Sequence, residues 1–146
     1  METAELNDKP EFDIESLPVE IKLIGEMKSP WSDNPRMMDA WSVTIGKKWG
    51  NKHGQWVTTY FTGTGLRDKR TSRPKRPKII DVLYALFTDA SAADENFSGW
   101  CENYGYSDDS IKALNVYKAC AETAINLRRQ FDSETRAKIQ AVIQEI

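Results

Sequence analysis

Long apolar runs, cysteine and histidine are all scarce in this 146-residue chain. No apolar run reaches the roughly 18 residues of a membrane-spanning helix, so we expect no membrane segment. The acidic N-terminal region lacks a hydrophobic signal region, which argues against secretion. The only cysteines, Cys101 and Cys120, lack the spacing of a metal site and are too few for a disulfide framework. We therefore predict a cytosolic protein with reduced thiols and with no metal or other cofactor.

Signatures of catalysis are also missing. His53 is the only histidine and has no acidic neighbour in the sequence. The turn Gly63–Gly65 lacks the further glycine, or the Gly-Lys-Ser/Thr ending, of a nucleotide-binding loop. The acidic pairs in residues 81–109 lack the regular spacing of an EF-hand calcium loop. We predict that the protein is not an enzyme, and a site that combines Cys101 with His53 is the alternative that stays open.

Charge is unevenly distributed along the chain, although the net charge is only −2. Residues 1–20 contain seven acids and one base, and residues 67–78 contain seven bases and one acid. Residues 81–109 contain seven acids and neither lysine nor arginine. The small net charge excludes a global attraction to nucleic acid or membrane, but the folded chain can present separate faces of opposite sign.

The order of apolar patterns predicts one α+β domain over residues 18–146, preceded by a flexible acidic arm at residues 1–17. A hydrophobic fraction of 40% is sufficient for a core. Within the domain we predict a three-stranded antiparallel β-meander at residues 18–65, a basic loop at residues 66–78 and about four helices at residues 79–146.

Alternation of apolar and polar residues predicts where the three strands lie. They cover residues 19–27, 40–47 and 55–62, and the second strand should place Trp41, Val43 and Ile45 on one face. Three strands cannot bury both faces by themselves. We therefore expect the following helices to cover one face of the sheet.

The first of these helices begins after Pro77 and is the most apolar segment of the chain. Its two apolar stripes predict that both adjoining faces are buried: one stripe is Ile79, Val82, Leu83 and Leu86, and the other is Ile80, Tyr84 and Phe87. A short helix at residues 97–104 should end at Gly105, a suitable left-handed cap.

The longest predicted helix covers residues 107–131, with Ser107 or Asp109 as its cap. Periodicity predicts the inward stripe Ile111, Leu114, Tyr117, Ala121, Ala124 and Ile125. A last helix, capped by Asp132 or Ser133, should extend to Ile146.

The basic loop is the strongest candidate for a binding surface. Its lysines and arginines cluster where a helix begins, although the helix macrodipole disfavours cations there by about 0.3–1 kcal/mol each. Positive charge beside spare backbone N–H groups suits an anion such as a phosphate or an acidic protein patch. The alternative is a solvated linker without a ligand. The residues of this candidate site are Arg67, Lys69, Arg70, Arg73, Lys75, Arg76 and Lys78.

Two further surfaces are candidates for partner binding. Trp31 lies in the two-proline loop SPWSDNP, where it can anchor a partner or pack at the edge of the core. An acidic face can imitate a nucleic-acid backbone and occupy a basic groove on another protein. Its residues would be Asp89, Asp94, Glu95 and Glu102. The aromatic strand that precedes the basic loop (Trp56, Tyr60, Phe61) can in addition stack on bases.

A set of motifs in residues 38–131 resembles a family of small proteins encoded by bacteriophages and prophages. The motifs are the strand DAWSVTI, the strand ending TGTG, and the block DVLYALFTDA…FSGWCENYGYSDDSIKALNVYKAC. The family has no established activity, so no catalytic residue is carried over. The resemblance implies a phage product in the cytoplasm of a host bacterium.

Small phage proteins without enzyme signatures often inhibit host defence, as anti-CRISPR proteins do. By this analogy we expect a non-enzymatic protein that binds a host protein or nucleoprotein, such as a CRISPR effector, through a charged surface. The alternative is an accessory protein of phage DNA replication or recombination, which would bind DNA or RNA directly. Direct binding to bare nucleic acid distinguishes the two.

Overall fold

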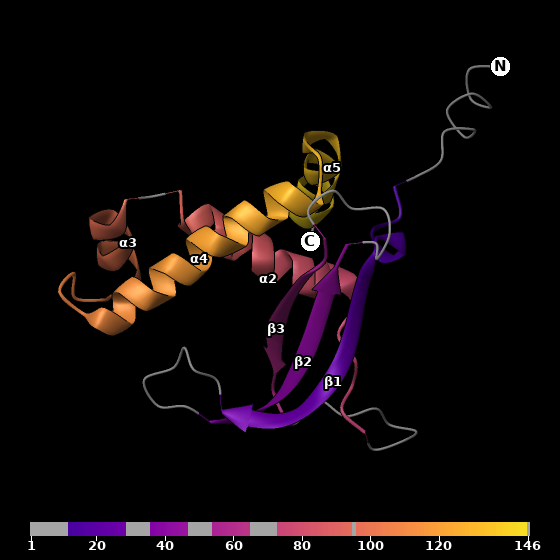
Figure 1. Ribbon diagram of the computed structural model, residues 1–146, viewed down its shortest axis with the longest axis horizontal. Coiled ribbons are helices and arrows are strands. Elements are labelled where there is room, and N and C mark those ends of the chain that lie inside the picture. The colour runs from indigo at the N-terminus through magenta and orange to yellow at the C-terminus, as the bar shows by residue number, and fades with distance from the viewer. Residues whose placement is uncertain (1–11, 29–35, 47–53, 65–72, 95, 146) are drawn as a thin grey trace.

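The computed structural model describes residues 12–28, 36–46, 54–64, 73–94 and 96–145. A three-stranded sheet comes first and helices follow, so the predicted α+β class and the order of elements are confirmed (Figure 1). The described elements are a 3-10 turn η1 (Ile14–Ser16), strands β1 (Val19–Lys28), β2 (Met37–Ile45) and β3 (Trp56–Thr62), and helices α2 (Ile79–Ala92), α3 (Phe97–Tyr104), α4 (Ile111–Gln130) and α5 (Ser133–Gln144).

The sheet is an antiparallel meander in the order β1-β2-β3, so β1 and β3 are its edge strands. Strand β1 pairs with β2 from Val19 opposite Ile45 to Lys28 opposite Met37, with an irregularity between Leu23 and Gly25. Because Gly25 has a φ of 142°, which favours glycine, the chain can bend at this point. Strand β3 pairs with β2 without interruption.

The core lies between one face of the sheet and α2. Trp41, Val43 and Ile45 are buried on this face, as their alternation predicts. Val82 and Leu83 of α2 are fully buried against them. Ile139 of α5 and Phe131, which caps α4, close the same cluster from the helical side.

The second apolar stripe of α2 is only partly buried, so the prediction that α2 buries both faces is wrong. Phe87 is buried and Ile80 half-buried, but the ring of Tyr84 remains 47% exposed. The reason is that the sheet, α4 and α5 cover the other sides of α2, and the side that carries Tyr84 faces solvent. The helix begins at Ile79, the predicted start of the helical half, with Lys78 as its cap.

The buried face of α4 also differs from the predicted stripe. Ile111 is 78% exposed and Ile125 is 48% exposed, whereas the buried residues are Ala113, Cys120, Ala124 and Leu127. The small alanine and cysteine side chains allow α4 to pack closely along α2, and the larger aliphatic residues then point outward. Ser110 caps the helix by accepting the N–H of Ala113, in place of the predicted Ser107 or Asp109.

Part of the segment predicted to be a flexible arm, residues 1–17, is folded. Residues 12–17 belong to the domain, because Ile14 is only 8% exposed and lies in the main core cluster. Asp13 caps η1 by accepting the N–H of Glu15. Residues 1–11 lie outside the described part of the chain.

Candidate binding surfaces

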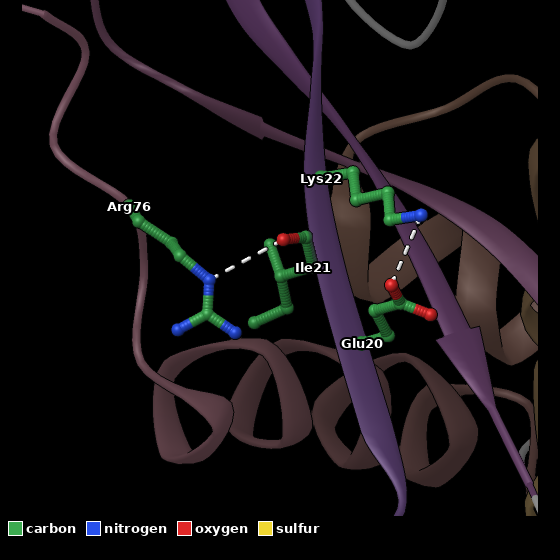
Figure 2. Close-up of polar contacts among 4 residues, drawn as sticks. All are labelled: Glu20, Ile21, Lys22 and Arg76. Atoms are coloured by element: carbon green, nitrogen blue, oxygen red, sulfur yellow. Dashed lines mark hydrogen bonds and ion pairs between the residues drawn. The ribbon is translucent and has the colours of Figure 1, made fainter.

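Four of the seven predicted basic residues lie in the described chain, in a segment that runs from Arg73 to Lys78 and leads into α2. Their side chains are exposed, and Pro77 between them is buried. The segment passes beside the outer edge of β1, where Nε of Arg76 donates a hydrogen bond to the carbonyl oxygen of Ile21 at 3.3 Å (Figure 2). The basic segment therefore covers this sheet edge in addition to presenting charge. The other predicted residues, Arg67, Lys69, Arg70 and Trp31, lie outside the described residues.

The first backbone N–H groups of α2 are already occupied, so the predicted spare donors for an external anion are absent there. Oε1 of Glu15 accepts the N–H of Ile79, and Oε2 of the same carboxylate accepts the N–H of Ile80, each at 3.1 Å. Asp81 accepts the N–H of Lys78 at 3.1 Å. Two carboxylates thus supply the negative charge that a helix N-terminus favours, and a phosphate would have to displace them.

The aromatic strand does not form the open stacking platform that the sequence suggests. Trp56 and Tyr60 pack against the core cluster. Burial raises the pKa of Tyr60, and the nearby Asp81 carboxylate raises it further. Phe61 lines a cleft between β3 and the helices, and Trp56 lines the same cleft. The aromatic rings are therefore committed to packing.

Helix α3 forms a second small core with the start of α4, at the end of the molecule farthest from the sheet (Figure 1). The ring of Trp100 stacks on Tyr106 with centroids 5.0 Å apart and meets Tyr117 edge-on at 5.6 Å. Asn96 caps α3 by accepting the N–H of Gly99, and Gly105, at a φ of 75°, ends it as predicted. The aromatic cluster holds α3 and its flanking turns in a defined position.

Exposed acids surround this aromatic cluster. Asp94 precedes α3, Glu102 lies on α3, and Asp108 and Asp109 follow it, and all four are exposed. Residues 81–109 include no lysine or arginine, and the first base that follows them is Lys112 on α4. The structure therefore brings the predicted Asp94 and Glu102 to one end of the molecule, together with two acids that the sequence explained only as helix-start chemistry. Glu95 is outside the described residues.

Asp89, the remaining predicted acid, has a different environment. It lies on α2 beside the cleft next to β3. The side chain keeps contact with solvent, but the surrounding protein excludes enough water to raise the pKa of its carboxyl. Asp89 is therefore separate from the acidic end, which we define by Asp94, Glu102, Asp108 and Asp109.

Helix α2 separates the two charged regions. The basic segment meets its N-terminus and the acidic end follows its C-terminus, and its 14 residues span about 21 Å at about 1.5 Å per residue (Figure 1). The cations of the basic segment oppose the helix macrodipole, which favours anions at the N-terminus, and the carboxylates of Glu15 and Asp81 offset them there. The two charged regions therefore lie at opposite ends of α2.

Chemistry at the two cysteines is suppressed. Both are buried free thiols, in agreement with the sequence prediction of reduced thiols. Burial, together with the Asp89 carboxylate, raises the pKa of Cys120 to about 11. Burial raises the pKa of Cys101 as well, with a smaller contribution from Asp108. Neither thiol is a nucleophile at neutral pH. Within the described ranges no three His, Cys, Asp or Glu side chains group as metal ligands would, and His53 lies outside them.

A cleft of about 940 Å³ lies between β3 and the helices, and sequence patterns gave no sign of it. Its walls come from β1, β3, α2 and α4, so residues up to about a hundred positions apart combine to form it. Only the folded arrangement brings them together. Its residues are Met27, Lys28, Trp56, Val57, Thr58, Thr59, Phe61, Leu86, Asp89, Val116, Ala119, Cys120, Glu122, Thr123 and Asn126.

Comparison of the chain with protein-family models, with curated proteins and with solved structures returned no match. Among the described residues, none of the helices combines the length and the apolar character that crossing a membrane requires.

Proposed function

We propose that this protein is a non-enzymatic inhibitor that binds a host defence nucleoprotein, in the manner of an anti-CRISPR protein, and that the acidic end contacts the target. The single observation that supports the proposal most is the separation of charge at the two ends of α2. The acidic end carries four exposed carboxylates on a rigid aromatic support. A rigid acidic surface of this kind is complementary to a groove that normally holds nucleic acid.

Two other observations support a binding protein over an enzyme. The thiols are buried with raised pKa values. Apart from the buried Asp39, the described acids are spread over an exposed surface, and two of them, Asp89 and Glu122, lie at the cleft. The resemblance of residues 38–131 to phage proteins supplies the biological setting of the proposal, which is the cytoplasm of a bacterial host.

The experiment is a plating assay in a panel of bacterial strains, each with one defined CRISPR system that blocks a targeted phage. The wild-type protein should restore plating in at least one strain. Replacement of two acids at the acidic end, D94N with E102Q, should abolish this effect in that strain. The matched control is E134Q, which removes an exposed carboxylate on α5 and should leave plating restored. Failure of the wild type in every strain contradicts the proposal.

Direct nucleic-acid binding by the basic segment is the second candidate function, as part of phage DNA replication or recombination. The observation in its favour is that Lys75 and Lys78 are exposed and take part in no ion pair between described residues. Fluorescence anisotropy of short DNA and RNA probes at two salt concentrations tests it. Binding that weakens steeply with salt and is lost in a K75Q and K78Q variant favours this function. Binding unaffected by the two substitutions rules it out for this segment.

A further inference from the structure

The two edge strands of the sheet, β1 and β3, differ in how they are protected from pairing with another strand. The outer edge of β1 is covered by the segment that leads into α2, through the hydrogen bond from Arg76 to the carbonyl of Ile21 (Figure 2). Strand β3 is the other edge. Its sequence, WVTTYFT, has none of the features that usually protect an edge, since it lacks charge, proline and an internal glycine. An unprotected edge of β-branched and aromatic residues is a template for another strand.

The register shows which backbone groups of β3 point outward. The carbonyl of Ile21 points away from β2, because it accepts a hydrogen bond from Arg76. Ile21 lies opposite Val43, and Val43 opposite Thr58. In an antiparallel sheet, two residues that lie opposite each other either exchange both hydrogen bonds or exchange none, and the two kinds of pair alternate along the strands. Ile21 and Val43 exchange none, so the backbone groups of Val43 point toward β3. Those of Thr58, opposite Val43, therefore point toward β2.

The N–H and carbonyl groups of Val57, Thr59 and Phe61 therefore point to the free side of β3. No hydrogen bond to these groups comes from any described residue outside the sheet. A strand placed there would find three donors and three acceptors in the spacing of a regular ladder.

The cleft runs along this free edge. The consecutive residues 56–59 all line it, and side chains of consecutive strand residues alternate between the two faces of a sheet. A cavity that contacts both sets reaches the edge of the strand, and Met27 and Lys28 at the end of β1 also line it. The opposite wall is α4, through Val116, Ala119 and Cys120, and the side chain of Val57 is 60% exposed.

The charge of the cleft favours a positively charged occupant. Two carboxylates, Asp89 on α2 and Glu122 on α4, line it, against the single ammonium of Lys28. The rest of the wall is apolar or carries hydroxyl and amide groups. A strand with alternating apolar side chains and one or two lysines or arginines matches this surface.

We propose that the β3 edge binds an extended, basic peptide segment of a partner protein, which adds as a fourth strand antiparallel or parallel to β3. The backbone ladder to Val57, Thr59 and Phe61 supplies the affinity, as in other cases of strand addition. Alternate side chains of the peptide pack on the apolar wall of α4, and a cationic side chain pairs with Asp89 or Glu122. This inference does not rest on the proposed defence target.

A second copy of the chain fits this edge less well than a peptide. The cleft holds β3 on one side and α4 on the other. If the β3 strand of a second copy paired with this β3, the α4 helix of the second copy would have to enter the same space. A single extended segment brings no such flanking helix.

The experiment starts from a library of random octapeptides, selected on the immobilised full chain. Selected peptides should alternate apolar and other residues and should be enriched in lysine and arginine. A fluorescein-labelled peptide from the selection is then titrated with protein and followed by anisotropy. Backbone amide NMR shifts on binding should centre on Val57, Thr59 and Phe61.

The decisive pair of variants changes one edge residue. T59P removes an outward N–H without removing a hydrogen bond to β2, so the sheet should persist and binding should weaken by about tenfold or more. The matched control T59V keeps the N–H and should bind within about twofold of the wild type. In case T59P does not fold, A119W fills the cleft from the half-buried Ala119 on the wall formed by α4 and should also weaken binding.

Three outcomes would overturn the inference. One is a selection that yields no binder or only binders without lysine and arginine. Another is binding that T59P and A119W leave unchanged while both variants stay folded by circular dichroism. The third is self-association of the wild type, seen by sedimentation and abolished by T59P, which would assign the edge to a second copy. Loss of peptide binding has no bearing on the plating assay, so the two proposals fail separately.

Discussion

Removal of the Glu15 carboxylate tests how the N-terminal segment is attached to the helical half. Glu15 lies before the sheet, yet it accepts the first two N–H groups of α2, at 3.1 Å each. We predict that E15A lowers the free energy of unfolding and that the loss comes from the end of a helix 64 residues away in sequence.

The expected size of the loss follows from these contacts. Each hydrogen bond contributes about 0.5–1.5 kcal/mol, and a negative charge at a helix N-terminus contributes about 0.3–1 kcal/mol. Because Glu15 is exposed, the low end of the sum applies, and we expect about 1.5 kcal/mol. For a chain of this length the melting temperature should fall by about 3–6 °C.

The assay is urea denaturation followed by circular dichroism, with thermal melting as a second measurement. The matched control is E20Q, because Glu20 is an exposed carboxylate of the same region that forms an ion pair with Lys22 at 3.0 Å (Figure 2). Such a pair contributes about 0–1 kcal/mol, so the control should change stability little. An E15A protein as stable as E20Q would refute the role assigned to Glu15.

Two further predictions concern helix ends. The N–H of Thr135 holds the pKa of Asp132 below its usual value of 3.8, so the stabilisation is present above that pH and is lost as the pH falls through the lower, folded-state pKa. D132N should therefore lose less stability than the wild type between about pH 6 and about pH 3 in urea titrations, and an unchanged pH dependence would contradict this. Gly105 has a φ of 75° and open space around it, so G105A should cost about 1 kcal/mol through backbone strain alone, whereas G63A should be nearly neutral; equal melting temperatures for the two variants would contradict this.

The sequence predicts the sheet well because its signal is local. Alternation over a few residues identifies the buried faces of Trp41, Val43 and Ile45, and turn residues separate the strands. The caps Gly105 and Asp132 are also found from local chemistry. In each of these cases the interaction that stabilises the element lies within a few residues of it.

The misses have a common physical origin in contacts between distant segments. Periodicity ranks Ala124 correctly as inward but also Ile111 and Ile125, which are exposed, and it misses Ala113, which is buried beside Trp100 and Cys101 of α3. No local pattern can show that Glu15 occupies the start of α2. Local patterns also cannot show the cleft beside β3 or the hydrogen bond by which Arg76 covers the edge of β1. The function that these surfaces serve stays a prediction.

The position of the sheet before the helices has a consequence for the nascent chain. Strand β3 ends at Thr62, and Ile139, which completes the main core cluster, is made 77 residues later. At about 5–20 residues per second, translation leaves the apolar face of the sheet uncovered for roughly 4–15 s. During that interval the unprotected edge of β3 and the open face are exposed together on the ribosome. Both surfaces are therefore available to chaperones until the last helix emerges.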